Sequence, residues 1–125
     1  MKINIKATGI ELTSAINDYV QKKVGSLEKY LAKREGVVVQ VEVGKSTKHH
    51  KSGDVFRAEA HLVGGGLNLY AASEQADLYA AIDLMKDDVV HKLTHLKGRK
   101  MALARRGAQA LKNMMRGFNP FRKRD

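Results

Sequence analysis

Residues 55–73 read VFRAEAHLVGGGLNLYAAS. Apolar and polar side chains alternate over residues 55–63, which is the period-2 pattern of a strand with one buried face. Three consecutive glycines, at 64–66, can adopt the positive φ values of a tight turn. Residues 67–73 then supply the returning strand. The stretch therefore predicts an antiparallel β-hairpin, and the flanking segments are expected to extend it into a sheet.

The sequence before this hairpin predicts a strand, a helix and another strand. Residues 2–7 alternate between polar and apolar side chains, and residues 37–43 are rich in β-branched valine. Between these two strands, Thr13 or Ser14 can cap the start of a helix. Apolar residues recur at helical spacing over residues 16–31, which predicts one amphipathic helix.

The sequence after the hairpin predicts a second helix that starts near Ser73 or Glu74, and Gly98 either ends this helix or only weakens it. Its apolar positions are Leu78, Ile82, Met85, Val89, Leu93 and Leu96. The element order is therefore β-α-β-β-β-α. We predict an α+β fold, a two-layer sandwich in which a four-stranded mixed sheet carries both helices on one face. The other face is expected to show polar side chains to water, namely Lys2, Asn4, Gln40, Glu42, Arg57, Glu59 and His61.

Positive charge is concentrated at the C-terminal end of the chain. Of 23 Lys and Arg residues in 125, nine lie in residues 99–125, together with one acidic residue. This segment carries +8 of the formal net charge of +10. We therefore predict two parts, a folded domain over residues 1–98 and a basic extension over residues 99–125 that is helical at first and disordered at its end.

A concentrated basic segment indicates a polyanionic partner, because like charges repel unless an anion neutralises them. The residues leave three interpretations open: the phosphates of a nucleic acid, an anionic membrane contacted by an amphipathic helix, or a solubilising extension. The apolar stripe of the segment is short and poor in Leu, Ile and Trp, which favours nucleic acid over a membrane. The chain has no Cys, no signal-peptide core and no apolar run of about 20 residues, so we expect a cytoplasmic protein without disulfides or membrane spans.

The helices carry further cations whose role the pattern alone leaves open. Lys22, Lys29 and Lys33 lie opposite the apolar stripe of the first helix, with Lys23 at its flank. Helical spacing places Asp18 within reach of Lys22, which favours a solvated surface with ion pairs. On the second helix the lysines lie at the margins of the stripe, where their stems can cover the edge of the core.

Enzymatic chemistry is not indicated. Asp87, His91 and His95 have a helical spacing that could place metal ligands on one face, and a metal nuclease built on them is the alternative from another class. However, neither a His-Glu-x-x-His motif nor an obvious further ligand accompanies them. The glycines at 64–66 precede a strand, whereas a phosphate-binding loop ends in Gly-Lys-Ser/Thr before a helix. We therefore predict no enzyme, no metal, no cofactor and no small-molecule substrate.

One stretch carries a family resemblance. Residues 71–83 read AASEQADLYAAID and lead into a helix that contains HKLT, while the N-terminal region has INI at 3–5, ELT at 11–13, Lys23, LE at 27–28 and Tyr30. Over about residues 1–100, the chain resembles the bacterial ribosome hibernation-promoting factors. This family includes the ribosome-associated translation inhibitors that were formerly called sigma-54 modulation proteins.

The resemblance implies the βαβββα fold and a non-enzymatic protein that binds the ribosome. Members of this family bind 16S rRNA in the decoding region of the small ribosomal subunit, block the tRNA and mRNA sites, and inhibit translation in stress or stationary phase. The rRNA-binding residues expected here are Lys22, Lys23, Lys29, Lys86, His91, Lys92, His95, Lys97, Arg99, Lys100, Arg105 and Arg106. Long family members have an extra C-terminal domain, so we expect this chain to be a short form that is monomeric off the ribosome.

The helices depart from the family pattern at several positions. Asn17, Ser26 and Asp88 stand where related proteins carry basic residues, and His91 and His95 replace stronger cations. We therefore expect the basic extension to restore phosphate contacts that the helices lack. The alternative function is a structured-RNA binding module without ribosome specificity, because a fold alone does not determine a function.

Overall fold

The computed structural model describes residues 1–46 and 53–96. Its elements are β1 (Lys2–Thr8), α1 (Ser14–Gly25), a 3₁₀ helix η1 (Ser26–Tyr30), β2 (Val38–Lys45), β3 (Phe56–Gly64), β4 (Leu67–Gln75) and a second α-helix over residues 78–96. The predicted element order and the α+β class are confirmed. Gly98, predicted to end or to weaken the second helix, and the whole extension over residues 99–125 lie outside the described residues.

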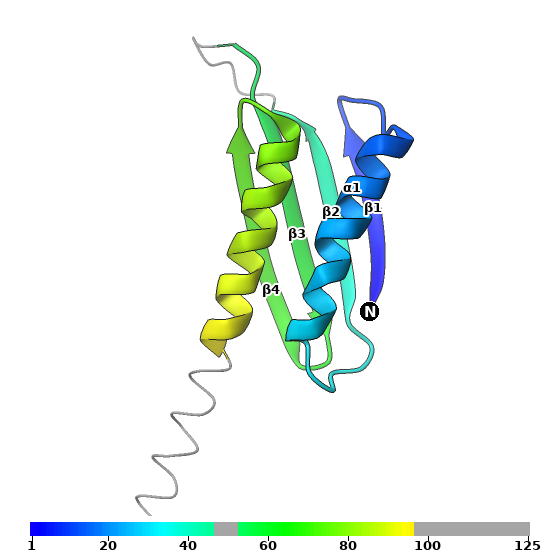
Figure 1. Ribbon diagram of the computed structural model, residues 1–125, viewed down its shortest axis with the longest axis vertical. Helices are drawn as coiled ribbons and strands as arrows, with labels where there is room; N and C mark the ends of the chain where they lie inside the picture. Colours follow the sequence, from blue (N-terminus) through cyan, green and yellow to red (C-terminus); the bar gives the residue numbers. More distant parts are fainter. Residues whose placement is uncertain (47–52, 97–125) are drawn as a thin grey trace, which may run out of the picture. The chain divides into compact units, whose positions relative to one another are not determined.

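The four strands form one mixed sheet in the order β1-β2-β3-β4. β1 pairs in parallel with β2, whereas β2 with β3 and β3 with β4 pair antiparallel. The parallel pair needs a long crossover between its strands, and α1 lies in that crossover. α1 and the second helix cover the same face of the sheet, as Figure 1 shows. The predicted two-layer arrangement is therefore confirmed.

The strand register places the apolar residues beneath the helices. Ile5, Val41, Ala60 and Ala71 are aligned in one row across the four strands. The core combines Val39, Val41, Val43, Ala58, Ala60 and Leu62 of the sheet with Val20, Val24, Leu27, Ile82, Met85 and Val89 of the helical layer. Burying one such large side chain contributes about 1.5–3 kcal/mol. This apolar layer therefore holds both helices on the sheet.

Glycine is required at the tip of the β3–β4 hairpin. Gly65 and Gly66 have φ angles of +58° and +82°, as the two central residues of a type I′ turn require. Gly64, the last residue of β3, has a φ of +108°. A Cβ at position 64 would lie 2.1 Å from the backbone carbonyl oxygen of Gly36. The hairpin can approach the loop before β2 this closely only because residue 64 has no side chain.

α1 starts at a predicted cap but changes helix type before its predicted end. The backbone N–H of Ile16 donates to Thr13 Oγ1 at 3.2 Å, which satisfies one of the amides left unpaired at a helix start. At Ser26 the α-helix gives way to η1. The hydroxyl of Ser26 donates to the backbone carbonyl of Lys23 at 2.6 Å, a local bond that competes with the regular helical pattern. Leu27 is nevertheless fully buried, so the apolar stripe continues through η1.

The second helix begins at residue 78, so the predicted start near Ser73 or Glu74 is wrong. Both residues belong to β4, and both are paired with residues of β3. Asp77 provides the cap instead. Its carboxylate accepts from the backbone N–H groups of residues 79 and 80 at 3.4 and 3.3 Å. β4 extends beyond the predicted strand, which ended at Ser73, because its pairing with β3 continues as far as Gln75.

Candidate nucleic-acid interface

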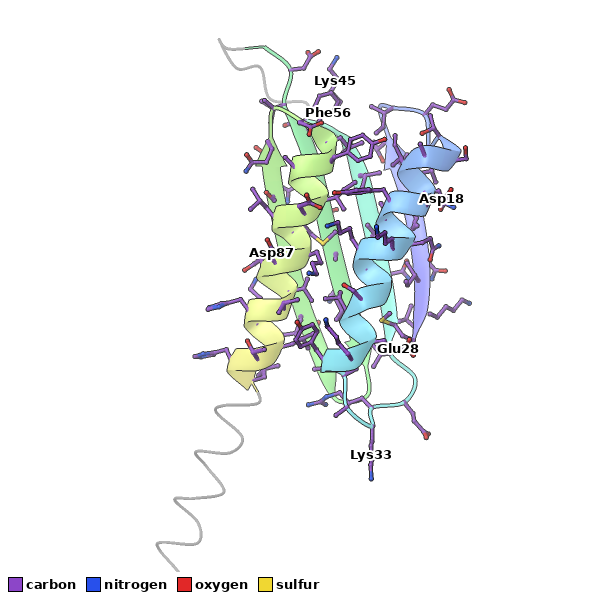
Figure 2. The ribbon with its side chains drawn as sticks, in the orientation of Figure 1. Asp18, Glu28, Lys33, Lys45, Phe56 and Asp87 are labelled. Carbon is purple, nitrogen blue, oxygen red and sulfur yellow. The ribbon has the colours of Figure 1, made fainter. Side chains whose placement is uncertain are left out.

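The outer surface of α1 and η1 carries exposed cations. Lys22 and Lys29 are exposed, and the ammonium of Lys29 lies 5.3 Å from the centre of the Tyr30 ring, within cation–π range. Within residues 1–46 and 53–96, no carboxylate lies within ion-pair distance of Lys22 or Lys29. The ion pair between Asp18 and Lys22 that helical spacing allowed is therefore not formed. Figure 2 shows Asp18 on α1 and Lys33 on the loop that follows η1, where Lys33 projects away from the sheet.

Tyr19, Lys23, Tyr79 and Asp83 join the two helices at the surface, and we call these four residues the interhelix cluster. Tyr19 Oη donates to Asp83 Oδ1 at 2.6 Å, and Lys23 Nζ lies 3.3 Å from the same oxygen. The Tyr79 ring meets the Tyr19 ring edge to face, with 4.8 Å between centroids. Lys23 Nζ also lies 5.5 Å from the centre of the Tyr19 ring. One carboxylate of the second helix thus anchors two side chains of α1.

Asp83 also alters the ionisation of both of its partners. The hydrogen bond to Asp83 raises the pKa of the Tyr19 phenol, and partial burial raises it further. The same carboxylate raises the pKa of the Lys23 ammonium. At neutral pH both groups are therefore protonated and able to donate to Asp83. The cluster carries no net charge, because the Lys23 cation is balanced by the Asp83 anion.

The lysines of the second helix are paired with aspartates of the same helix. Lys86 Nζ lies 3.8 Å from the carboxylate of Asp87. Lys92 Nζ lies 3.2 Å from Asp88, one helical turn away, and donates to the backbone carbonyl of Tyr70 on β4 at 2.5 Å. Each of these ammonium groups is thus partly neutralised. The described part of the second helix therefore presents less free positive charge than α1 and η1.

The structure describes seven of the twelve predicted rRNA-binding residues. Lys22, Lys23, Lys29, Lys86, His91 and Lys92 belong to the compact unit Met1–Leu93, and His95 belongs to the unit that starts at Thr94. His91 and His95 are exposed. Lys97, Arg99, Lys100, Arg105 and Arg106 lie outside the described residues. In the part of the chain that the structure describes, no three His, Asp or Glu side chains are grouped so that they could hold a metal ion.

Sequence reasoning missed the interhelix cluster. Tyr19 precedes Lys23 by one helical turn, and Asp83 closes the stretch 71–83 that carries the family resemblance. These spacings can be read from the sequence. The contacts of Tyr19 and Lys23 with Asp83 could not be predicted from it, because they depend on how α1 and the second helix are placed on the sheet.

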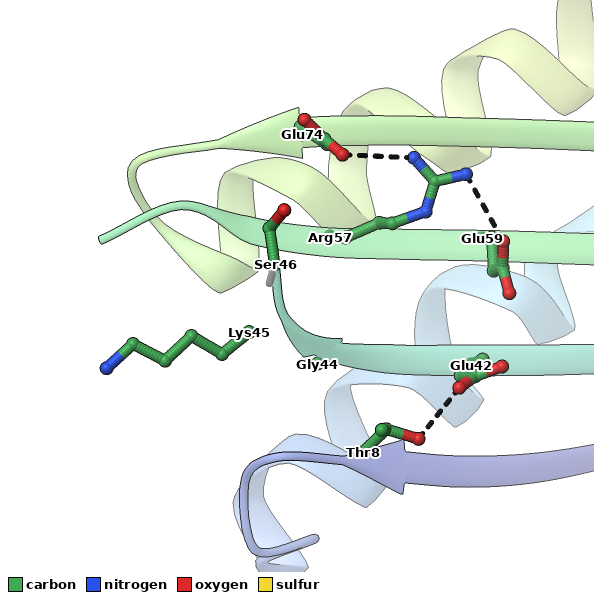
Figure 3. A pocket seen from close by; sticks show the side chains of 8 residues that line it. All are labelled: Thr8, Glu42, Gly44, Lys45, Ser46, Arg57, Glu59 and Glu74. Carbon is green, nitrogen blue, oxygen red and sulfur yellow. Dashed lines mark hydrogen bonds and ion pairs between the residues drawn. The ribbon is translucent and has the colours of Figure 1, made fainter. Parts of the chain in front are cut away.

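The opposite face of the sheet has a different electrostatic character. Arg57 lies between two carboxylates, with Glu59 at 3.3 Å and Glu74 at 3.2 Å, and Glu42 accepts from the Thr8 hydroxyl at 2.7 Å. Figure 3 shows these groups in a hollow of about 400 Å³, lined by Thr8, Glu42, Gly44, Lys45, Ser46, Arg57, Glu59 and Glu74. The hollow holds three carboxylates against two cations, Lys45 and Arg57, so its net charge is negative. The outer face of the helices is therefore the better surface for a polyanion.

Glu59 is expected to stabilise the fold at neutral pH but not in acid. Tyr70 Oη donates to Glu59 at 2.5 Å, and this bond lowers the pKa of the Glu59 carboxyl, with Arg57 contributing. A carboxyl whose pKa is lowered by folding adds stability above its unfolded pKa of about 4.3, and the contribution is lost as the pH falls through the folded value. We expect Glu59→Gln to lower the free energy of unfolding by about 1–2 kcal/mol near pH 7.

Urea denaturation over a range of pH tests this prediction. The difference in stability between the parent protein and Glu59→Gln should shrink steadily as the pH is lowered from about 5 to about 2. Glu11→Gln is the matched control, because Glu11 is exposed and makes no ion pair with any residue in the described ranges. A stability loss in Glu59→Gln that did not depend on pH would contradict the assigned role of the ionised carboxylate.

Fold and surface together define a class of protein. It is a small α+β domain in which a βαβββα chain forms one four-stranded sheet, with cations on the outer side of its two-helix layer. In the described residues, no helix is long and apolar enough to cross a membrane. Among the described residues, its polar features are surface ion pairs and exposed lysines.

Comparison with known proteins identifies the family within this class. Residues 3–101 match the family described as Sigma 54 modulation protein / S30EA ribosomal protein. The chain is 35% identical over 97 residues to the ribosome hibernation promoting factor of Escherichia coli (strain K12), with 78% of this chain and 94% of that protein covered. It is 31% identical over 101 residues to the factor of the same name from Azotobacter vinelandii, with 81% and 87% covered. The chain therefore belongs to this family of ribosome hibernation-promoting factors, as the sequence resemblance predicted.

Solved structures agree with this assignment. The crystal structure of the Thermus thermophilus Protein Y N-terminal domain superposes with a TM-score of 0.64 at 30% identity, covering 77% of this chain and 99% of that one. A ribosomal subunit interface protein from Coxiella burnetii has a TM-score of 0.61 at 19% identity and supports the fold alone. The family match ends at residue 101, so most of the basic extension lies beyond it.

Proposed function

We propose that this protein is a ribosome hibernation factor that binds 16S rRNA in the decoding region of the small ribosomal subunit. It blocks the tRNA and mRNA sites and inhibits translation in stress or stationary phase. The observation that carries the proposal is the match of residues 3–101 to a family whose curated relatives are named ribosome hibernation promoting factors. Nearly the whole described domain lies inside that match, and the proposal places the protein in the cytoplasm, where ribosomes are.

The outer face of the helices is the RNA-binding surface in this proposal. Lysine side chains contact phosphates, and a surface of two adjacent helices recognises the shape of folded RNA rather than its sequence. Lys22 and Lys29 are exposed and unpaired among the described residues, so they can form phosphate contacts without breaking an ion pair. The protein acts by occupying space. It therefore needs no catalytic group, metal or cofactor.

Neutralising two cations of α1 and η1 tests this surface. We expect Lys22→Gln/Lys29→Gln to weaken binding to isolated small subunits by about 10-fold. The slope of log Kd against log[salt] should become shallower by roughly 1.5, since two phosphate contacts are lost. Binding is measured by cosedimentation over a series of salt concentrations, and inhibition by cell-free translation with the same variants.

The open face of the sheet offers a matched control. Lys2→Gln/Lys6→Gln removes the same charge from β1, on the face away from the helices, and should leave binding almost unchanged. Excess tRNA should displace the parent protein from the small subunit. Equal affinity for naked duplex RNA, with no effect of tRNA, would instead support a structured-RNA binding module without ribosome specificity. Equal losses in the two double variants would contradict a specific role of the helix surface.

A further inference from the structure

We infer that Asp83 is a positioning residue for RNA binding, because it ties α1 to the second helix and fixes the ammonium group of Lys23 on the outer surface of the helices. The inference rests on the proposed function, in which that surface contacts rRNA phosphates. Its basis is the interhelix cluster. There Asp83 Oδ1 accepts a hydrogen bond from the Tyr19 hydroxyl at 2.6 Å and lies 3.3 Å from Lys23 Nζ.

The geometry restrains a side chain that is otherwise mobile. A lysine has four rotatable carbon–carbon bonds, and ordering it on binding costs conformational entropy. Here Asp83 holds the ammonium at the end of the side chain, and the ammonium lies 5.5 Å from the ring centre of Tyr19. The Tyr19 ring itself contacts Asp83 through its hydroxyl and packs in a T-shaped arrangement with Tyr79. Part of this ordering is therefore complete before RNA arrives. Preorganisation of this kind increases affinity without adding a contact.

Lys23 can contact Asp83 and a phosphate at the same time. An ammonium group has three N–H donors, and the Asp83 carboxylate occupies only one direction of approach. The side chain of Lys23 retains 33% of its surface exposed and that of Asp83 retains 41%. The cluster is therefore open to the outside and leaves donors of Lys23 available to a phosphate oxygen.

If only its charge mattered, Asp83 would weaken RNA binding rather than strengthen it. A carboxylate on a phosphate-binding surface repels RNA, so its removal should tighten binding if Asp83 acts only through its charge. If Asp83 positions Lys23, its removal should weaken binding although the protein becomes more positive. The sign of the change therefore separates the two interpretations.

The second helix provides a matched control for this sign. Asp87 lies one turn after Asp83 and pairs with the adjacent Lys86 at 3.8 Å. Among the described residues, no ion pair or hydrogen bond joins the Asp87 side chain to α1. Asp87→Ala and Asp83→Ala remove the same charge from the same helix, and Ala is favourable at both helical positions. Only Asp83→Ala breaks a bond between the helices.

The experiment compares these full-length variants in binding to isolated small subunits. We expect Asp83→Ala to bind about 5-fold more weakly than the parent protein and Asp87→Ala to bind equally well or more tightly. In a double-mutant cycle, Asp83→Ala should have little further effect in the Lys23→Gln background, because its role passes through Lys23. A loss of fold stability alone would not produce that dependence on Lys23. Thermal unfolding of each variant identifies any such loss.

Four results would overturn the inference or the function on which it rests. Binding of Asp83→Ala that equals or exceeds that of the parent would show that Asp83 acts only through charge. An undiminished loss in the Lys23→Gln background would show that its role does not pass through Lys23. The mobility of the Lys23 ammonium in the free protein can be measured by NMR relaxation. Equal mobility in the parent protein and in Asp83→Ala would show that Asp83 does not restrain Lys23. A parent protein that fails to bind small subunits while its Lys23 is restrained would refute the proposed function and the RNA role of Asp83, leaving only the restraint.

Discussion

Removal of residues 99–125 is expected to weaken binding to the small ribosomal subunit by about 100-fold or more at physiological salt. This segment holds nine of the 23 Lys and Arg residues and one of the 13 acidic residues. Each phosphate neutralised by a cation releases condensed counterions, and the affinity gained in this way depends steeply on salt. If about half of the nine cations contact phosphates, the slope of log Kd against log[salt] should become shallower by about 3–4.

The described structure explains why the extension should matter this much. On the second helix, Lys86 and Lys92 are paired with Asp87 and Asp88. The described part of this helix thus offers little positive charge that is not already in an ion pair. A separate source of positive charge is then needed for strong binding to a highly charged RNA.

A full-length variant separates charge from chain length. Replacing the nine Lys and Arg residues of the extension with Gln keeps its length, and it should weaken binding as much as truncation does. Filter binding from about 50 to about 200 mM salt supplies both the affinity and the salt slope. Truncation that left both values unchanged would refute a phosphate-binding role for the extension. If truncation weakened binding but the Gln variant bound as tightly as the parent protein, the contribution of the extension to affinity would not come from its charge.

The sheet could be predicted from the sequence because its signals are local. Alternation over residues 55–63, the three glycines at 64–66 and the valines of 37–43 each indicate a strand or a turn without reference to distant residues. The mixed sheet and the common face of the helices then follow from general rules of connection, whereas the strand order was not predicted from the sequence. The start of the second helix could not be predicted as well, because the continued pairing of β4 with β3 overrides the helical propensity of Glu74.

The cations of the candidate site could be listed from the sequence, but the ion pairs that they form could not be predicted. Helical spacing places Asp18 within reach of Lys22, yet that ion pair is not formed, whereas Lys92 is paired with Asp88 one turn away. Lys23 instead crosses to Asp83, 60 positions later in the chain. Pairing between elements depends on the distance and rotation of two helices packed on a sheet, and no short-range pattern encodes these quantities. The family resemblance placed Asp83 in a distinctive stretch without indicating what it contacts.

Gly64→Ala is expected to destabilise the fold by about 3 kcal/mol or more, the largest loss of stability that we predict for a single substitution. At this position φ is +108°, a conformation that residues with a Cβ avoid. The added methyl group would also lie 2.1 Å from the carbonyl oxygen of Gly36, a backbone atom that cannot move without shifting the start of β2. For a domain of this size, the midpoint of thermal unfolding should fall by roughly 10–20 °C.

Gly25→Ala is the matched control, and it should change stability in the opposite direction. Gly25 ends α1 with φ of −58° and ψ of −30°, and an added Cβ would have no atom within 4 Å apart from its chain neighbours and the helix's own backbone. Alanine fits this helical conformation and restricts the unfolded chain, so a gain of about 0.5–1 kcal/mol is expected. Circular dichroism melting of the two variants measures both effects. Equal losses would show that the strain at position 64 has been misjudged, because the two substitutions add the same methyl group and differ only in backbone conformation and neighbouring atoms.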